Sequence, residues 1–187
     1  MTSTADMTSA SGTLQTSATA TDPGPFTTAR REVELRRPAD VDAVNHNDLR
    51  AFMHQWWAAF DHIAPVDFFL AHLDDADMTF VLDGQPLATD HASFRTWYAS
   101  VPSTIPWDFH DVLDGVTVTG TAATGWTAEH FIRHVGEFHD VPIGQPGDGP
   151  GRVFNRVLRV TWQVEHDGER FVIRRYELAL AHNAIPL

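Results

Sequence analysis

The chain has 187 residues, a formal net charge of −12 and no cysteine. This length suits one domain with its own hydrophobic core. A hydrophobic fraction of 43%, with 12 Phe and 6 Trp, is typical of a folded chain. The negative charge excludes the basic surface on which binding to nucleic acids or anionic membranes depends. The absence of cysteine excludes disulfides and thiolate chemistry.

The cellular location is predicted from what the sequence lacks. No stretch approaches the roughly 18 apolar residues that a membrane-spanning helix needs. The first 20 residues are mainly Thr, Ser and Ala, without the basic start and apolar middle of a secretory signal. We therefore expect a cytoplasmic protein with no membrane or nucleic-acid partner.

The composition changes twice along the chain. Residues 1–28 are small and polar and bury too little apolar surface to offset the cost of ordering, which predicts a disordered N-terminal tail. Residues 29–44 are charged and interrupted by Pro38, so we expect an extended arm there. A periodic hydrophobic pattern starts at Asn45, and we predict one folded domain over 45–182.

Three helices are predicted in the first half of this domain. The first begins near Asn45 or Asn47, because asparagine caps helices well. A second, short helix is expected over 65–73, and a third begins at Thr89 or Asp90 and ends near position 100. The apolar residues of the first helix recur at the three- and four-residue spacing of one buried face: Leu49, Phe52, Met53, Trp56, Phe60 and Ile63.

The second half has the two-residue alternation of β-strands. A single early strand over 78–82, closed by the Asp83-Gly84 turn, is expected before the third helix. Helices that gather on one face of an antiparallel sheet define an α+β fold. The later strands are expected over 107–113, 116–119, 125–138, 154–164 and 171–180, with a flexible loop over 142–151.

Four short segments carry a resemblance that extends over residues 45–180. They are WAAFD at 57–61, LDDADM at 73–78, FRTWY at 94–98 and HDVLDGVTV at 110–118. With the order of elements, they resemble the nuclear transport factor two-like superfamily, in particular its SnoaL-like, ketosteroid isomerase and scytalone dehydratase branches. The resemblance implies a cone-shaped, curved mixed or antiparallel sheet wrapped around the N-terminal helices, a cystatin-like roll. It also implies an apolar pocket for a small ligand.

Asp61 and His110 are the first two candidate catalytic residues. In proteins similar to scytalone dehydratase, a Tyr-Asp pair stands at this helix end, and its Asp orients a pocket histidine. Here Asp61 keeps the Asp, and Phe60 replaces the Tyr. His110 stands where the resemblance places a pocket histidine, which can act as acid or base near neutral pH. Alternatively, Asp61 only accepts backbone hydrogen bonds, and His110 only satisfies a core carbonyl.

His130 and His134 are the other candidate catalytic residues. The resemblance places a second histidine in this region without choosing between the two. Four residues along a strand separate them by ~13 Å, so they cannot bind one metal ion together. The histidines are otherwise scattered, and no cysteine assists them, so we expect neither a metal nor a cofactor. Alternatively, both histidines face solvent.

Arg156 has the same parity as the apolar residues of its strand. A cation on an inward apolar face needs an anion, either Asp61 or Glu129 within the protein or a carboxylate or phenolate of a ligand. Alternatively, it lies beyond the covered part of the sheet and extends to water. Ketosteroid isomerase chemistry is rejected, because Phe80, Trp56 and Arg159 occupy its three key positions. The expected ligand contacts are aromatic apart from this Arg: Trp56, Phe60, Phe80, Trp97, Trp126, Arg156 and Trp162.

Together these features predict a small, cofactor-free enzyme of the lyase, isomerase or cyclase type. It would act on a hydrophobic or aromatic metabolite by His/Asp acid–base chemistry in an apolar pocket. The alternative is a non-catalytic module of the same fold that binds a small ligand or dimerises. A third, disfavoured reading is the small subunit of a ring-hydroxylating oxygenase. The resemblance also implies a homodimer that pairs through the outer side of residues 153–164 and 171–180.

Overall fold

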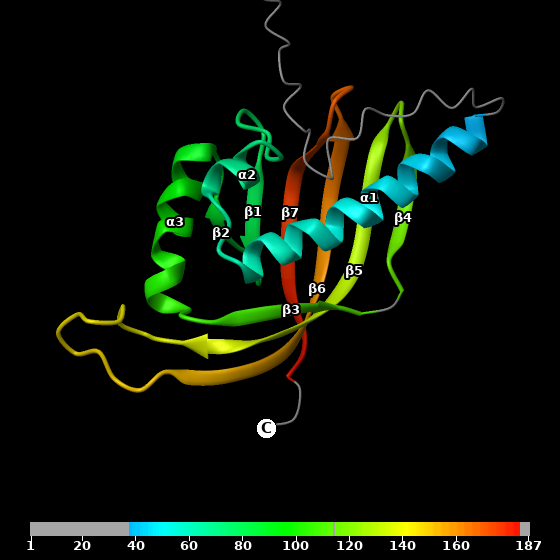
Figure 1. Ribbon diagram of the computed structural model, residues 1–187. Coiled ribbons are helices and arrows are strands. Elements are labelled where there is room, and N and C mark those ends of the chain that lie inside the picture. The colour runs from blue at the N-terminus through cyan, green and yellow to red at the C-terminus, as the bar shows by residue number, and fades with distance from the viewer. Residues whose placement is uncertain (1–37, 114, 184–187) are drawn as a thin grey trace, which may run out of the picture. The chain divides into compact units, whose positions relative to one another are not determined.

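A computed structural model of the chain describes residues 38–113 and 115–183, with side chains over 45–113 and 115–182 (Figure 1). The tail expected over 1–28 and the first part of the expected arm lie outside the described residues. Among the described helices, none combines the length and the apolar character needed to cross a bilayer.

Within the described residues, seven strands form one sheet in the order β2-β1-β7-β6-β5-β3, with β4 also paired to β5. β1 and β7 are parallel, and the other pairs are antiparallel, so the sheet is mixed. Figure 1 shows the helices on one face of this sheet, which confirms the predicted α+β class. The strands are β1 Thr79–Leu82, β2 Gln85–Ala88, β3 Asp108–Val112, β4 Thr117–Thr121, β5 Gly125–Phe138, β6 Arg152–His166 and β7 Phe171–Asn183; the helices are α1 Pro38–Asp61, α2 Val66–Leu70 and α3 His91–Thr104.

Helix α1 begins earlier than the sequence pattern predicts. Residues 38–44 are helical, so the extended arm expected over 29–44 is wrong for this part. Proline fits the first position of a helix, because its missing N–H would have no intrahelical partner there. Pro38 therefore marks the start of the helix rather than an interruption of an extended segment.

The early part of the sheet contains a hairpin where a single strand was expected. Asp83 and Gly84 have φ angles of 48° and 78°, the left-handed values that a two-residue hairpin turn requires. Leu82 therefore pairs with Gln85, and β2 follows directly. The four residues of β2 include Pro86, which is tolerated only at a sheet edge, and so short a strand has little alternation to detect.

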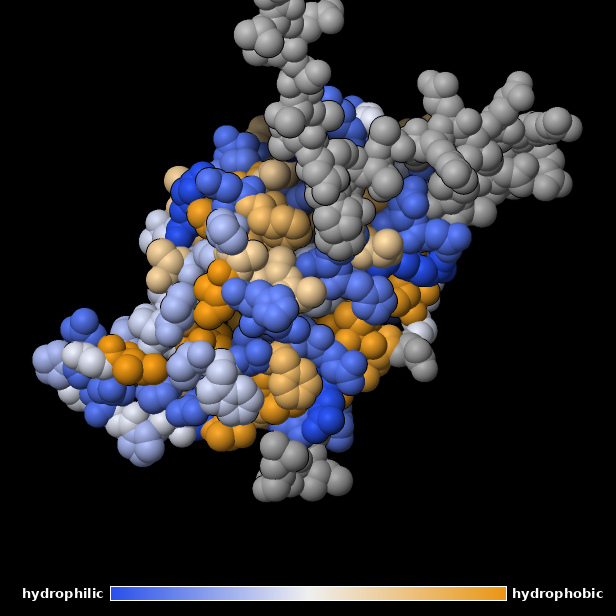
Figure 2. Space-filling model, viewed as in Figure 1, coloured by the Kyte–Doolittle hydropathy of each residue, from blue (hydrophilic) through white to orange (hydrophobic). Residues whose placement is uncertain are grey.

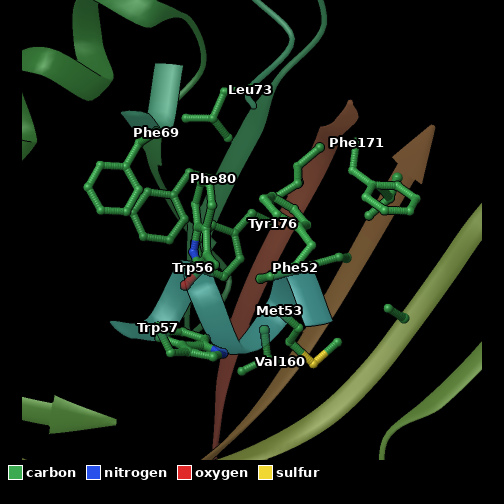
Figure 3. Packing of buried hydrophobic residues seen from close by; sticks show 14 of the residues in the cluster. Phe52, Met53, Trp56, Trp57, Phe69, Leu73, Phe80, Val160, Phe171 and Tyr176 are labelled. Carbon is green, nitrogen blue, oxygen red and sulfur yellow. The ribbon is translucent and has the colours of Figure 1, made fainter. Parts of the chain in front are cut away.

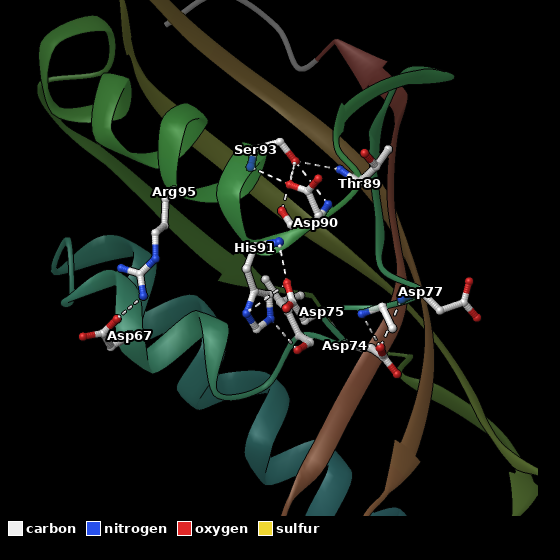
Figure 4. Close-up of polar contacts among 11 residues, drawn as sticks. Asp67, Asp74, Asp75, Asp77, Thr89, Asp90, His91, Ser93 and Arg95 are labelled. Atoms are coloured by element: carbon white, nitrogen blue, oxygen red, sulfur yellow. Dashed lines mark hydrogen bonds and ion pairs between the residues drawn. The ribbon is translucent and has the colours of Figure 1, made fainter.

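Helix α3 begins after Asp90, one of the two predicted starts, and has a capping box there. The Asp90 side chain accepts a hydrogen bond from the backbone N–H of Ser93 at 2.7 Å, and the Ser93 hydroxyl accepts from the Asp90 N–H at 3.1 Å (Figure 4). The first helical residue, His91, contacts the Leu73 carbonyl through Nε2 at 2.8 Å. The His91 contact fixes the start of α3 against the segment that enters β1.

The core lies between α1 and the sheet and is rich in aromatic rings (Figure 3). Trp56 on α1 meets Trp162 of β6 at 5.7 Å and Tyr176 of β7 at 5.8 Å, both edge to face. Phe80 stacks on Tyr176 at 4.6 Å. Helix α1 crosses β7, β6 and β5 (Figure 1), and its last residue, Asp61, reaches β3.

Candidate functional site

The C-terminal end of α1 places Asp61 beside β3. The helix ends with Ala64 N–H bonded to the Ala59 carbonyl and Ile63 N–H to the Phe60 carbonyl, with Ile63 at φ 48°, the pattern of a Schellman motif. A carboxylate at this end opposes the helix dipole. Hydrogen bonds from His110 hold the Asp61 carboxylate at this position despite the dipole.

One Asp61 oxygen binds His110 twice. Oδ1 accepts from the His110 backbone N–H at 3.0 Å and from the ring Nδ1 at 2.7 Å. A carboxylate only accepts hydrogen bonds, so Nδ1 carries the proton, and Nε2 of the neutral ring keeps its lone pair. The backbone bond that the sequence left as an alternative is therefore present, and the ring bond accompanies it.

Strand pairing brings three charged or ionisable side chains into one row. His110 of β3 pairs with His134 of β5, which pairs with Arg156 of β6, and paired residues share a face of the sheet. The neighbouring row consists of Asp108, Gly136 and Phe154. The sheet register therefore assembles this polar cluster from positions up to 48 residues apart.

The His110 ring lies in a stack of planar groups. Its centroid is 4.6 Å from that of Trp57, with 27° between the planes, and 4.3 Å from that of His134, with 20° between the planes. Both faces of the imidazole are therefore covered. Only the ring edge that carries Nε2 is left for chemistry, and Nε2 lies 3.8 Å from Asp108 Oδ2, too far for a direct hydrogen bond.

His134 is held as a neutral hydrogen-bond donor. Nε2 donates to Asp108 Oδ2 at 3.1 Å, and Nδ1 accepts from the Arg156 guanidinium at 3.3 and 3.4 Å. Burial lowers the pKa of His134 to about 4. The hydrogen bond to Asp108 opposes this shift, and the charges of His110 and Arg156 add to it. His134 therefore stays uncharged at neutral pH.

His130 is buried away from this cluster. Trp57 Nε1 donates to its Nε2 at 2.9 Å, so Nδ1 carries the proton, and it has no partner among the described residues. Burial lowers the pKa of His130 to about 3. Both His130 and His134 thus face inward, at 0% and 6% exposure. Only His134 joins His110.

Arg156 finds neither Asp61 nor Glu129. Within the described part of the chain, no carboxylate lies within 4.0 Å of its guanidinium, which stands 4.8 Å over the Phe154 ring. Burial lowers the pKa of Arg156. The group is a partly buried cation whose contacts are an imidazole nitrogen and an aromatic face.

The expected aromatic ligand contacts pack mainly against one another. Phe60 is nearest to the cluster, with its ring 6.1 Å from that of His110. Trp97 packs on Phe80 at 4.8 Å. Trp56, Phe80, Trp126 and Trp162 are each no more than 3% exposed. These rings form the core, and contact between them and a ligand stays a prediction.

An open recess of about 580 Å³ lies elsewhere, on the outer face of the sheet. Its floor is a row of polar residues that runs across the strands. The recess shares no residue with the histidine cluster. In the space-filling view of the helix side, hydrophobic and hydrophilic residues are interspersed (Figure 2). The homodimer expected through the outer face stays a prediction. The polar row in the floor of the recess runs across five strands: Thr119, Thr127, Gln163, Arg175 and Thr79.

Asp108, His110 and His134 bring donor atoms within 4.8 Å of one another, close enough for one metal ion. Spacing along one strand does not reveal this group, because it forms by the pairing of β3 with β5. Two features oppose a metal: His134 Nε2 carries a proton while Arg156 donates to the other nitrogen, and the guanidinium adds a positive charge beside the site. The cluster is therefore better suited to moving protons.

Sequence reasoning missed Asp108 and Trp57. Asp108 has the same strand parity as His110, two residues away, which was a usable signal. Trp57 adjoins Trp56 on α1, but a single helical face drawn at ideal spacing favours Trp56 alone. The structure instead buries both indoles, at 0% and 3% exposure.

The sequence matches no protein family and no curated protein. Solved structures are similar in fold. A proposed aromatic ring hydroxylase from Novosphingobium aromaticivorans is 19% identical, with a TM-score of 0.58 over 74% of this chain and 87% of that one. A proposed scytalone dehydratase from the same organism is 11% identical, with a TM-score of 0.58 over 80% and 92%.

A third similar structure is a proposed dehydratase of the nuclear transport factor two-like family from Streptomyces avermitilis. It is 12% identical, with a TM-score of 0.55 over 75% of this chain and 98% of that one. Other similar structures are described as having a cystatin-like fold. The chain therefore has the nuclear transport factor two-like, cystatin-like fold that its sequence resembles. At these identities the likeness concerns the fold alone.

Proposed function

We propose that this protein is a cofactor-free catalyst of proton transfer on a hydrophobic or aromatic metabolite. Dehydration, isomerisation and cyclisation all fit this chemistry. The observation that carries the proposal is the 2.7 Å bond between Asp61 Oδ1 and His110 Nδ1, which leaves Nε2 as a base on the ring edge that neither stacked ring covers. Two of the structurally similar proteins are proposed dehydratases.

His110 would act as acid and base in turn. Nε2 takes a proton from a substrate C–H or O–H, and Asp61 holds the ring in the required tautomer and orientation. The resulting imidazolium lies between the carboxylates of Asp61 and Asp108. Nε2 then returns its proton to another substrate atom in an isomerisation, or to a departing hydroxyl in a dehydration, which releases water.

His134 and Asp108 would complete the site on the other side of His110. The His134 ring stacks against His110 and fixes its position, while its low pKa keeps it uncharged beside a developing imidazolium. Asp108 side-chain atoms are 14% exposed and those of His110 are 6% exposed. Substrate would therefore approach Nε2 from the side of the carboxylates.

A non-catalytic binding module is the second candidate function. The packing of the expected pocket walls against one another, with Trp56 and Trp162 fully buried in the core, counts against a closed pocket, and the dimerising form of this module needs none. Such a protein would tolerate loss of the Asp61–His110 pair. The proposed catalyst would not.

The test uses cyclic and aromatic ketones and β-hydroxy ketones in D₂O, with deuterium incorporation and water loss followed by NMR. His110→Asn should lower the rate by about 10²–10⁴-fold, the usual contribution of a general acid–base group. His54→Asn, at an exposed position of α1, is the matched control and should leave the rate unchanged. Unaltered turnover in His110→Asn would refute the catalytic proposal. Ligand binding without turnover in the wild type would favour the binding module.

A further inference from the structure

Arg156 is the charged group of the cluster that internal contacts satisfy least. A guanidinium offers five N–H donors, and Arg156 uses Nε and Nη2 on one acceptor, His134 Nδ1, at 3.4 and 3.3 Å. Both distances are long for N–H···N bonds. Within the described residues, the other donors have no hydrogen-bond acceptor. The charges of Asp83 and Asp108 act on Arg156 from a distance and partly offset the effect of burial on its pKa, but neither carboxylate contacts the guanidinium. Burial of a cation without a paired anion is costly.

Other arginines show that the chain does not lack carboxylates. Arg95 binds Asp67 at 2.7 Å, Arg152 binds Asp140 at 2.7 Å, and Arg174 binds Glu165 at 2.9 Å, all with arginine side chains at least 44% exposed. The chain thus pairs arginines at the surface, where a pair contributes little, whereas the more deeply placed Arg156 has no carboxylate in direct contact among the described residues.

The surroundings of Arg156 favour a planar ligand. Its guanidinium lies over the face of Phe154, and the Phe154 ring stands edge-on to His134 with the centroids 4.6 Å apart. The next row along the sheet is apolar, with Ile132 paired to Leu158. A delocalised guanidinium among aromatic and aliphatic groups suits a charge spread over a conjugated, apolar molecule better than a compact, strongly hydrated anion.

We propose that Arg156 binds the oxyanion of a conjugated ring substrate, a phenolate or an enolate. The inference rests on the proposed function, because removal of a proton next to a carbonyl by His110 creates an enolate oxygen that needs a cation. His110 and Arg156 stand two strand spacings apart in one row, roughly 10 Å between Cα atoms. The substrate therefore has fused rings, or one ring with a conjugated side chain, that can reach both residues.

The test uses 7-hydroxycoumarin, a fused-ring phenol whose neutral and ionised forms differ in fluorescence. The wild type should bind the phenolate at least tenfold more tightly than the phenol, as one charge-assisted hydrogen bond implies. The bound probe should therefore ionise at lower pH than the free probe. Arg156→Met should abolish this preference, and Arg156→Lys should keep part of it.

Two controls separate loss of charge from loss of structure. 7-Methoxycoumarin cannot ionise, and it should bind equally to the wild type and to Arg156→Met. Arg159→Met, at an exposed position of the same strand, should retain the phenolate preference. The proposal is overturned if the wild type prefers the phenol or binds neither coumarin, or if Arg156→Met keeps the preference for the anion.

The two proposals fail separately. His110→Asn should keep the phenolate preference while losing proton exchange, because the oxyanion is bound by Arg156. Loss of the preference in Arg156→Met together with unchanged turnover in His110→Asn would sustain the anion site and refute His110 as the base. If instead Arg156→Met keeps the phenolate preference and His110→Asn loses turnover, only the anion site is refuted.

Discussion

His134 and His139 lie five residues apart and both contact carboxylates, yet their pKa values move in opposite directions. Burial lowers the pKa of His134 to about 4. For His139, loss of solvent also works against protonation, but hydrogen bonds to Asp148 and Glu137 outweigh it and raise the pKa. Their side chains are similarly covered, at 7% and 11% exposure, so surface area alone does not separate them.

The surroundings of the two rings explain the difference. His134 lies deep in the domain and faces one carboxylate, Asp108, with a guanidinium on its other nitrogen. His139 follows β5 at the surface, where Nε2 meets Glu137 at 2.9 Å and Nδ1 meets Asp148 at 3.2 Å. Depth and a neighbouring cation keep one imidazole neutral, while a carboxylate on each nitrogen favours the charged form of the other. Strand β5 thus supplies an uncharged histidine to the site, and the residue after it, His139, lies between Glu137 and Asp148 and ties the following loop to the strand. These three residues are called the clamp below.

The largest expected effect is acid destabilisation through the two buried histidines, to which His130, with a pKa of about 3, contributes more than His134. For His134 the expected loss follows from the size of its own shift. Because its folded-state pKa lies below the ordinary 6.5, the unfolded chain binds more protons between those values. The contribution of the neutral His134 to the free energy of unfolding is then complete above about pH 6.5 and is lost as the pH falls towards 4. This loss is worth about 3 kcal/mol for one such histidine. Urea unfolding at pH 7, 5.5 and 4 measures it.

His134→Gln sharpens that measurement. The variant should be less stable than the wild type at pH 7, because it loses the contacts of the ring. It should also show a flatter decline towards pH 4, since one titrating group is gone. An equally steep decline would mean that His130 or the carboxylates, rather than His134, dominate the acid response.

Two glycines allow the cluster and the clamp to be disturbed separately. A Cβ on Gly136 would approach Phe154 Cζ to 2.7 Å, Asp108 Cβ to 2.8 Å and the Trp107 carbonyl to 2.8 Å. Backbone and strand atoms there cannot yield easily, so Gly136→Ala should cost about 2 kcal/mol, as overpacked positions do. It should also displace Phe154 from His134.

Gly151→Ala is the matched comparison at the clamp. The three atoms nearest to the added Cβ would be Glu137 Oε1, Glu137 Cγ and His139 Nε2, all in side chains that can rotate away. Thermal unfolding should therefore show a smaller loss for Gly151→Ala than for Gly136→Ala. Equal losses would show that the cluster is no more rigid than the loop.

Much of the fold could be predicted from local patterns. Alternation located β5 at 125–138 to the residue, and the Asp90 signal gave the start of α3. The start of α1 and the short strand β2 were missed, because a proline and a four-residue edge carry ambiguous local signals. These elements depend on tertiary packing more than on intrinsic propensity.

The candidate site was less predictable. The resemblance suggested Asp61 and His110, and the structure places them 2.7 Å apart. The contact between His110 and His134 depends on the register of β3 against β5, and spacing within each strand does not encode that register. For the same reason, the sequence left three alternatives open for Arg156, an internal carboxylate, a ligand anion or water, and the fold places neither Asp61 nor Glu129 in contact with it.

The smallest and most local effect should come from the clamp. Because the pKa of His139 is raised above the ordinary 6.5, its contribution is complete below that pH and is lost as the pH rises through the folded-state value. A neutral ring can donate to only one of Glu137 and Asp148. The Gly144 amide, which donates to Asp148 at 3.0 Å, should then lose protection from hydrogen exchange, relative to its intrinsic rate, as the pH rises from 6 to 9. In His139→Gln, the protection of the Gly144 amide should be low at every pH, with global stability unchanged. If protection in the wild type does not depend on pH, the loop is held by its backbone bonds and not by the imidazolium.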